Sequence, residues 1–383
     1  MRAGQFTDSY LPIVNGVSTF IYLFKRTLEK FGHDPHVFTF GYTDRADPEP
    51  NVVRSAGWPV GQTGYHGGLS YSRRAWSIAE TMDVLHAHHP FLSGALAARL
   101  SRRQNKPLVF TNHTRYDDYA RYYLPFLPTC ATLGLLGAWM RRFARRCDSI
   151  IAVSAAAQSM LESFNVSAPI EIIPNGIDLD RFAQSTPATK SDLGLPPDAF
   201  VLMYVGRLGP EKNLATLLDA FAHTARRAPN AVLAVVGDGP QAAALRKKTR
   251  EHNLTGRVRF LGTRPNQDIP SLLSAAHAFV TASVTESHPM TIIEALAAGQ
   301  PVLGFDVPGI RETVSDGKDG LLAPTDPEAL GERMARIATD AELRARLSDG
   351  ARRSAQQYNI ETTTRRIVDL YERVIRERKQ MNS

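Results

Sequence analysis

YVGRLGPEKNL, from Tyr204 to Leu214, joins a hydrophobic strand that ends at Gly206 to a helix that begins near Lys212. Arg207 and Lys212 lie on either side of the turn. A guanidinium fork and an ammonium group beside a helix N-terminus form a plausible diphosphate site, because backbone N–H groups and the helix dipole add to both side chains. Basic residues of an ordinary surface loop are the alternative interpretation.

Short β-branched or aliphatic runs alternate with helical patterns on both sides of this turn, which predicts an α/β fold with mostly parallel strands. In the first half the expected strands are Val37–Phe40, Val84–His86, Leu108–Thr111, Ser149–Val153 and Ile170–Ile173. In the second half they are Val201–Val205, Val232–Val236, Val258–Leu261, Ala278–Thr281 and Pro301–Gly304. The boundary between the two series lies near residues 175–198. We therefore expect two doubly wound domains whose strand carboxyl ends meet at a ligand cleft.

Composition excludes several classes of protein. The chain has 383 residues, 43% hydrophobic and 22% charged, which is ordinary for a globular protein and long for a single core. Cys130 and Cys147 are too few for a disulfide framework and lack C-x-x-C spacing, which fits a reducing compartment. The N-terminus has no signal-peptide pattern. The longest uncharged apolar stretch, Leu133–Met140, is far shorter than the roughly 20 residues of a membrane span.

Positive charge is concentrated in the first half. The net charge is +7, and residues 99–146 contain ten Lys and Arg against two Asp. TLGLLGAWMRRFARR, Thr132–Arg146, repeats apolar residues at helical spacing and predicts a basic amphipathic helix. Such a helix either lies in the headgroup layer of an anionic membrane or covers a core with its arginines in water. The candidate membrane-binding residues are Trp139, Arg141, Arg142, Phe143, Arg145 and Arg146. No nucleic-acid-binding signature accompanies the charge.

A second candidate site is TESHPMTIIEALAAGQPVL, residues 285–303, in which Glu286 precedes a helix and Glu294 lies within it. Carboxylates accept hydrogen bonds from sugar and ribose hydroxyls, and the N–H groups of Met290 and Thr291 are first-turn donors toward an anionic ligand. A solvated helix with incidental acidic residues is the alternative.

Together these motifs resemble the retaining glycosyltransferases of family 4, whose signature is R-x-x-x-x-K after one strand and E-x7-E later in the chain. The resemblance covers essentially the whole sequence. The matching segments are FTDSYLPIVNGVST (6–19), HHPFLSG (88–94), HTRYDDYARYY (113–123), IPNGIDLDRF (173–182), VGRLGPEKN (205–213) and VVGDGP (235–240). The first and third look most like the branch that contains diacylglycerol glucosyltransferases and lipid mannosyltransferases.

The fold implied is GT-B, with two Rossmann-like domains facing each other across a cleft and a C-terminal helix crossing back to the N-terminal domain. We expect an acceptor- and membrane-facing domain of residues 1–178 with 358–383, and a donor-binding domain of residues 179–357. By the same resemblance, Arg207 and Lys212 would contact the donor diphosphate and Glu286 the sugar hydroxyls. His113 would lie near the transferred sugar and completes the expected catalytic set. The further donor-binding residues would be Gly16, Gly262, Thr263, Met290, Thr291 and Glu294.

The implied reaction is retaining transfer of a hexose, glucose first, from a nucleotide sugar such as UDP-glucose to a membrane lipid such as 1,2-diacylglycerol. No metal or cofactor is implied, because two cations stabilise the leaving diphosphate. The partners would be the nucleotide sugar, the lipid acceptor and an anionic surface, with no nucleic acid. The protein would be cytoplasmic and peripheral on the inner face of the cell membrane. A soluble or polyprenyl-linked acceptor, and GDP-mannose as donor, are the alternatives within this chemistry. A GT-B-like epimerase and a non-catalytic binding module fit the motif residues less well.

Two segments depart from the family pattern. Pro289 stands where many relatives have Gly and supplies no N–H. The opening MRAGQF is a poor first strand, because Gly4 and Gln5 stand where relatives have aliphatic residues.

A histidine cluster at residues 86, 88 and 89 could suggest a metal site together with His113. A strand end lining the cleft explains these histidines better, because alternate residues of a strand point the same way.

Overall fold

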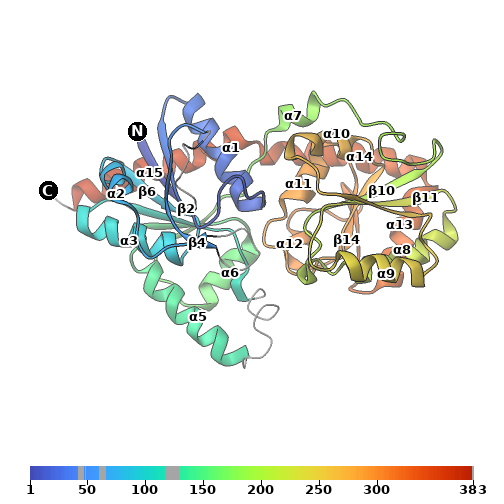
Figure 1. Ribbon diagram of the computed structural model, residues 1–383, viewed down its shortest axis with the longest axis horizontal. Coiled ribbons are helices and arrows are strands. Elements are labelled where there is room, and N and C mark those ends of the chain that lie inside the picture. The colour runs from blue at the N-terminus through green and yellow to red at the C-terminus, as the bar shows by residue number, and fades with distance from the viewer. Residues whose placement is uncertain (42–46, 48, 60–65, 118–128, 382–383) are drawn as a thin grey trace. The chain divides into compact units, whose positions relative to one another are not determined.

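The structure is a computed structural model that describes residues 1–41, 47, 49–59, 66–117 and 129–381 (Figure 1). The chain divides into two compact units. The first comprises residues 1–176 and 360–383, and the second residues 177–359. Each unit is built on one parallel sheet with helices on both faces, which confirms the α/β class and the two doubly wound sheets predicted from the sequence.

The first unit contains seven parallel strands in the order β3-β2-β1-β6-β7-β8-β9. Their bounds are β1 (Arg2–Phe6), β2 (Asp34–Gly41), β3 (Val52–Ala56), β6 (Val84–Ala87), β7 (Leu108–Asn112), β8 (Ser149–Ala152) and β9 (Ile170–Ile172). A short antiparallel pair is formed by β4 (Trp58–Pro59) and β5 (His66–Gly67). Alternate strand residues point to opposite faces, so each strand contributes to two layers of core.

Helices cover both faces of this sheet. One face is covered by α1 (Gly16–Lys30) and by the C-terminal α15 (Ile360–Gln380), which lie side by side in Figure 1. The other face is covered by α2 (Arg73–Ala79), α3 (Leu92–Gln104), α5 (Thr129–Ala144) and α6 (Ala155–Ser163). The return of the C-terminal helix to the first unit is therefore confirmed.

The second unit contains six parallel strands in the order β12-β11-β10-β13-β14-β15. Their bounds are β10 (Phe200–Val205), β11 (Ala231–Val236), β12 (Val258–Gly262), β13 (Ala278–Val280), β14 (Val302–Phe305) and β15 (Gly320–Ala323). One face packs on α8 (Leu214–Arg227), α9 (Ala242–Glu251) and α13 (Pro327–Thr339). The other packs on α7 (Leu179–Ala183), α10 (Ile269–Ser274), α11 (Met290–Ala297) and α12 (Pro308–Arg311). Residues of α14 (Ala341–Ala355) enter both cores, and η1 (Pro210–Lys212), η2 (Asn266–Asp268) and η3 (Gln356–Tyr358) are single 3₁₀ turns.

The opening segment, expected to be a poor strand, forms β1, an interior strand of the first sheet between β2 and β6. Gly4 leaves room for the stacked rings of Phe6 and Phe38, whose centroids are 4.7 Å apart. A Cβ at Gly4 would lie 3.0 Å from both Phe6 and Met82. Gln5 is fully buried and hydrogen-bonded on both sides. The prediction is wrong because packing between strands, not strand propensity, decides these two positions.

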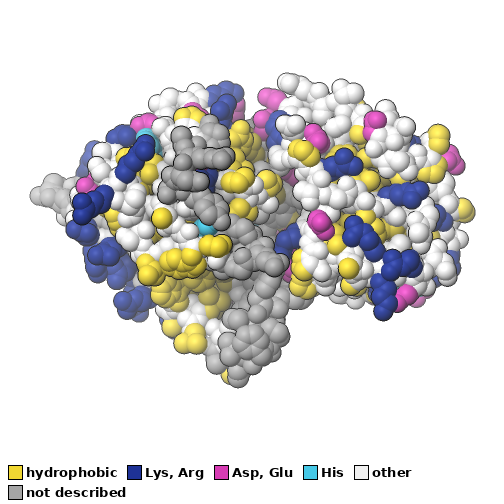
Figure 2. Space-filling model, viewed as in Figure 1, with side chains coloured by type: hydrophobic (Ala, Val, Ile, Leu, Met, Phe, Trp, Pro, Cys, Tyr) yellow, Lys and Arg dark blue, Asp and Glu magenta, His cyan; other side chains and the backbone are white. Residues whose placement is uncertain are grey.

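The basic amphipathic helix is present as α5, but one of its candidate membrane residues is misassigned. Phe143 is buried and packs edge-on against Phe110 at 5.1 Å between ring centroids. It shares the sheet-facing side of α5 with Met140, one turn earlier, so it belongs to the core. Leu135 and Trp139 are the outward apolar residues, at 74% and 41% exposure. Figure 2 shows hydrophobic side chains gathered where Figure 1 places α3 and α5, with basic side chains beside them.

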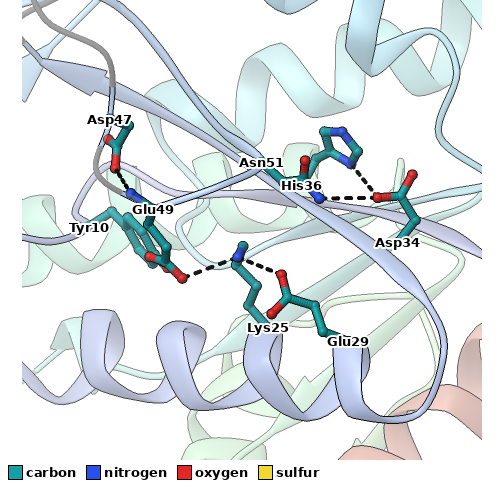
Figure 3. A network of polar contacts seen from close by, with 8 residues as sticks. All are labelled: Tyr10, Lys25, Glu29, Asp34, His36, Asp47, Glu49 and Asn51. Atoms are coloured by element: carbon teal, nitrogen blue, oxygen red, sulfur yellow. Dashed lines mark hydrogen bonds and ion pairs between the residues drawn. The ribbon is translucent and has the colours of Figure 1, made fainter.

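A buried ammonium group ties α1 to the loops that follow β1 and β2 (Figure 3). The Lys25 side chain is fully buried, and its Nζ lies 2.7 Å from Glu29 Oε1 and 3.1 Å from Glu49 Oε1. Tyr10 Oη donates to Glu49 Oε2 at 2.7 Å. Burial and the adjacent Glu49 carboxylate raise the pKa of Tyr10, so this hydroxyl stays a donor. The two carboxylates supply the counter-charge that a buried Lys requires.

Lys25→Met is expected to lower the free energy of unfolding by about 3 kcal/mol, because two carboxylates then lose their buried counter-charge. Urea unfolding followed by circular dichroism measures the change. Lys30→Met is the control, since Lys30 pairs with Glu361 at 2.5 Å but is 67% exposed and its loss should change stability little. Similar losses in the two variants would contradict the assignment.

Candidate active site

In each sheet the order in which successive strands are added reverses once, between β1 and β6 in the first unit and between β10 and β13 in the second. In the first unit β1 leads to α1 on one face, while its neighbour β6 leads to α3 on the other. In the second unit β10 leads to α8 and its neighbour β13 leads to α11 on the opposite face. Ligands of open parallel sheets bind beyond the strand carboxyl ends at such a point. A ligand site is therefore expected in the segments that follow these four strands.

The turn after β10 is folded around a buried carboxylate. Arg207 Nη2 donates to Glu211 Oε1 at 2.7 Å, and the side chains are 49% and 2% exposed. The carbonyl oxygen of Glu211 accepts from the hydroxyls of Ser283 and Thr285 at 3.4 and 3.3 Å. A Cβ at Gly209 would lie 2.4 Å from Glu211 Oε2, so a larger residue there would have to displace the Glu211 carboxylate. Glu211 thus orients Arg207 and ties the β10 turn to the segment after β13.

The adjacent GDG turn supports this arrangement through its glycines. Gly237 has φ +127°, and a Cβ there would lie 2.0 Å from the carbonyl oxygen of Gly206. Leu208 N–H donates to Asp238 O at 2.9 Å, and Gly237 N–H donates to Gly262 O at 2.8 Å. The turns after β10, β11 and β12 are therefore hydrogen-bonded to one another. The GDG segment at residues 237–239 therefore holds in place the turn that carries Arg207.

Lys212 and Glu286, two of the predicted site residues, follow the neighbouring strands β10 and β13 and meet in the second unit. Lys212 Nζ lies 2.8 Å from Glu286 Oε1, with the side chains 24% and 13% exposed. The backbone of Glu286 is held against Gly309 at the start of α12, where a Cβ would come within 1.8 Å of Glu286 O. Asn213, directly after Lys212, donates from Nδ2 to Ala282 O at 3.1 Å. An ammonium and a carboxylate therefore lie together at the switch point.

The helix after Glu286 begins without a side-chain cap. Pro289 is the N-cap of α11, and Met290 and Thr291 are the first two residues of the helix. Glu294 lies inside the helix and is 8% exposed. Burial raises the pKa of Glu294 to about 7, with the Arg181 charge opposing the shift. The charge of this carboxyl therefore changes near neutral pH.

In the first unit, the helix that follows β1 begins with a capping box. Asn15 Oδ1 accepts from Ser18 N–H at 2.9 Å, and Ser18 Oγ accepts from Asn15 N–H at the same distance. Asn15 Nδ2 also donates to Ser9 Oγ at 2.9 Å. Gly16 is the first residue of α1, so its N–H lies at the helix end that favours anions.

His113 follows β7, one strand from the reversal. Its Nε2 lies 3.0 Å from His88 Nδ1, and its ring centroid lies 5.3 Å from that of Phe20 in α1. Burial lowers the pKa of His86 to about 3 and that of His88 well below its usual value, so both rings are neutral. In the part of the chain that the structure describes, no three His, Cys, Asp or Glu side chains are grouped to hold a metal ion.

Both halves of the chain match known families. Residues 14–181 match the model for Glycosyltransferase Family 4, and residues 185–354 match the model for Glycosyl transferases group 1. A D-inositol 3-phosphate glycosyltransferase from Frankia alni is 32% identical over 307 residues, which cover 76% of this chain and 74% of that protein. The chain belongs to glycosyltransferase family 4.

Two further similarities extend along nearly the whole of this glycosyltransferase. An alpha-monoglucosyldiacylglycerol synthase from Acholeplasma laidlawii is 29% identical over 388 residues, covering 97% of this chain and 96% of that one. The crystal structure of Anabaena HepE in complex with UDP and glucose has a TM-score of 0.78 at 22% identity, covering 97% and 99% of the two chains. The fold expected from the resemblance, GT-B, is confirmed.

The glycosyltransferase thus assembles its predicted residues in two groups. The second unit brings Arg207, Lys212 and Glu286 to one reversal point, with Gly262 and Thr263 at the end of the hydrogen-bonded β12 turn. The first unit places Gly16 and His113 at the carboxyl edge of its own sheet. Of the motif HTRYDDYARYY, residues 118–123 lie outside the described residues.

Three residues with evident site contacts are missing from the predicted set. Glu211 holds Arg207, while His88 and Gln5 form a path of contacts leading away from His113. Glu211 stands four residues after Arg207, but Arg207 lies in the turn before the 3₁₀ segment Pro210–Lys212, so the spacing rule for pairs within one helix does not identify this contact from the sequence. The sequence predicts for His88 and His89 a strand end that lines the cleft, with a metal site as the alternative, and for Gln5 only an unfavourable strand position.

Proposed function

We propose that this protein is a retaining, metal-independent hexosyltransferase that moves glucose from UDP-glucose to a membrane lipid such as 1,2-diacylglycerol. The observation that carries the proposal is the Lys212–Glu286 ion pair at the switch point of the second unit, beside Arg207 held by Glu211. The name of the Acholeplasma relative supports the sugar and the acceptor. The UDP and glucose bound to a protein of the same fold support the donor.

Each group has a role that follows from its charge. Arg207 and Lys212 stabilise the negative charge that develops on the departing diphosphate, so no metal ion is required for that task. Glu286 accepts hydrogen bonds from hexose hydroxyls, and Glu294 accepts from the ribose. The C1–O bond to the diphosphate breaks while the acceptor oxygen bonds to C1 from the same face. The proton of the acceptor hydroxyl passes to the departing phosphate oxygen.

The first unit would bind the acceptor and the membrane surface. Leu135 and Trp139 are exposed large apolar residues of α5, and Arg142 and Arg145 are exposed on the same helix. Apolar insertion and attraction to anionic lipid add together for such a helix, which supports a peripheral position on the inner face of the cell membrane. Among the described residues, no helix is both long and apolar enough to cross a bilayer.

A donor and acceptor panel tests the proposal. UDP- and GDP-hexoses are supplied with EDTA, with and without anionic liposomes that contain diacylglycerol, and the anomeric configuration of the product is determined by NMR. An α-linked glycolipid formed from UDP-glucose is the expected product. Equal turnover without liposomes would favour a soluble acceptor, turnover only with added polyprenyl phosphate a polyprenyl-linked one, and use of GDP-mannose alone a mannosyltransferase. No turnover with any donor would contradict the proposal.

The affinity for UDP-glucose is expected to rise about tenfold between pH 6 and pH 8. Glu294, with a pKa of about 7, is largely protonated at the lower pH, whereas the ribose hydroxyls donate best to its ionised form. Donor binding therefore favours the ionised carboxylate, and affinity increases as the pH rises through 7. Isothermal titration calorimetry measures the trend. Glu294→Gln should bind more weakly at pH 8 and show a flat profile, and an unchanged slope in that variant would assign the effect to another group.

Leu135→Glu is expected to weaken binding to anionic liposomes about tenfold, because a carboxylate replaces a leucine side chain of α5 that is 74% exposed and opposes the lipid charge. Liposome co-sedimentation measures the affinity. Leu69→Glu is the matched control, since Leu69 is 81% exposed and lies after β5, away from α5 in sequence. An equal loss in both variants would indicate a general charge effect and would contradict docking through α5.

A further inference from the structure

A continuous line of buried polar side chains runs from His113 through the core of the first unit. His113 Nε2 lies 3.0 Å from His88 Nδ1, and His88 Nε2 lies 2.9 Å from Gln5 Oε1. Gln5 Nε2 donates to Tyr371 Oη at 3.3 Å, and this hydroxyl lies 2.5 Å from His86 Nδ1. His86 Nε2 lies 2.6 Å from Thr111 Oγ1. The members come from β1, β6, β7 and α15 and the turns that follow β6 and β7, and the line is buried along its whole length.

The amide group of Gln5, near the middle of this line, determines which ring nitrogens of the histidines carry a proton. A neutral imidazole has one donor and one acceptor nitrogen. Gln5 Oε1 is an acceptor, so His88 carries its proton on Nε2 and accepts at Nδ1. The partner at that nitrogen is His113 Nε2, which must therefore be the donor. A neutral His113 then has its acceptor at Nδ1.

The other half of the line is consistent with this direction. Gln5 donates from its amide nitrogen to Tyr371, and the Tyr371 hydroxyl can then donate to His86 Nδ1. His86 is left with its proton on Nε2, directed at Thr111. Desolvation lowers the pKa of His86 to about 3 and raises that of Tyr371, so neither group changes its proton count near neutral pH. Every bond in the line has one donor and one acceptor.

We propose that Gln5, acting through His88, fixes the tautomer and orientation of His113 so that His113 offers Nδ1 as a hydrogen-bond acceptor to a hydroxyl of the transferred hexose. The hexose rests on the function proposed above, whereas the tautomer rests on the contacts alone. Gln5 and His88 are positioning residues in this account.

A glutamine in an interior strand of a sheet needs such an explanation. A buried amide is unfavourable unless its oxygen and nitrogen are both hydrogen-bonded, and an aliphatic residue would serve the packing of β1 equally well. Gln5 supplies an acceptor on one side and a donor on the other, which is what sets the direction of the line. No aliphatic residue can distinguish the two tautomers of His88.

Gln5→Met and Gln5→Glu separate positioning from packing. Methionine keeps the volume but gives His88 no acceptor, so kcat for transfer should fall about tenfold with the KM for the donor unchanged. The carboxylate of Gln5→Glu still accepts from His88 Nε2–H, so kcat should stay within about threefold of the wild-type value. A merely structural Gln5 predicts the opposite order, because a buried carboxylate disturbs a core more than methionine does. Thr27→Val, which removes a buried hydroxyl of α1 outside the line, should leave kcat unchanged.

The tautomer itself is measured without turnover. Long-range ¹H–¹⁵N correlation spectra of histidine-labelled protein, assigned with His113→Gln, should show His113 protonated on Nε2 in the unchanged protein and in Gln5→Glu, and a mixture of tautomers in Gln5→Met. His113 protonated on Nδ1, or one tautomer in all three proteins, would overturn the inference. A kcat for Gln5→Met equal to that of the wild-type protein would also overturn the inference. If no donor is turned over, the proposed function fails while the spectra still decide this inference.

Discussion

Lys212→Met is expected to lower kcat/KM for hexose transfer about 10³-fold. The variant removes a cation from the place where charge develops on the departing diphosphate. It also leaves Glu286, which lies 2.8 Å from Lys212 Nζ, without its partner beside an anionic substrate. The loss should therefore exceed that of a single missing hydrogen-bond donor. Initial rates with UDP-glucose and diacylglycerol liposomes measure it, and the melting temperature shows that the variant is folded.

Two further variants identify the source of that loss. Lys248→Met is the matched control: Lys248 Nζ lies 2.6 Å from Asp219 Oδ2, is 28% exposed and belongs to the same unit. Its rate should be nearly unchanged. Lys212→Met combined with Glu286→Gln should lose less than the product of the two single losses, because the double variant no longer leaves a carboxylate uncompensated. A large loss with Lys248→Met, or independent effects in the double variant, would mean that the pair does not act as a unit.

The parts of the fold that are predictable from the sequence are those set by hydrophobic pattern. Runs such as Val201–Val205 and Val232–Val236 are apolar enough to be recognised as buried parallel strands, and the structure has both. β1 is different, because Gly4 is explained by the rings of its neighbours and Gln5 by its hydrogen bonds to His88, in the turn after β6, and to Tyr371 of α15. Such contacts join residues far apart in the chain, and a local pattern does not contain them.

The candidate site shows the same division. Arg207, Lys212 and Glu286 are predictable because their chemistry and spacing form a motif, and the structure brings Lys212 and Glu286 into contact. Glu211 is not, because its role is to hold another side chain from a buried position. The prediction that Phe143 binds the membrane is wrong for a related reason. Helical periodicity shows that α5 has an apolar face, but only the packed structure shows which of its apolar residues face the sheet.

Arg207→Met is expected to lower kcat/KM about 10³-fold while weakening the binding of UDP only about tenfold. A guanidinium carries five N–H donors in a rigid fork, so the group that Glu211 holds at 2.7 Å can also face a phosphate. The charge on the diphosphate grows as the bond to the sugar breaks, so the interaction should be stronger in the transition state than in the ground state. Steady-state kinetics and calorimetric titration with UDP measure the two quantities.

The comparison between these two losses decides the role of Arg207. If UDP binding and kcat/KM fell by the same factor, Arg207 would bind substrate and transition state alike and would contribute nothing to the chemical step. Arg227→Met is the control, because Arg227 is also 49% exposed and paired with a glutamate, Glu332, yet it lies at the end of α8. Glu211→Gln should lower kcat/KM about tenfold by releasing Arg207, and adding it to Arg207→Met should cause no further loss. An additive loss in that double variant would show that Glu211 acts on the site by a path that does not pass through Arg207.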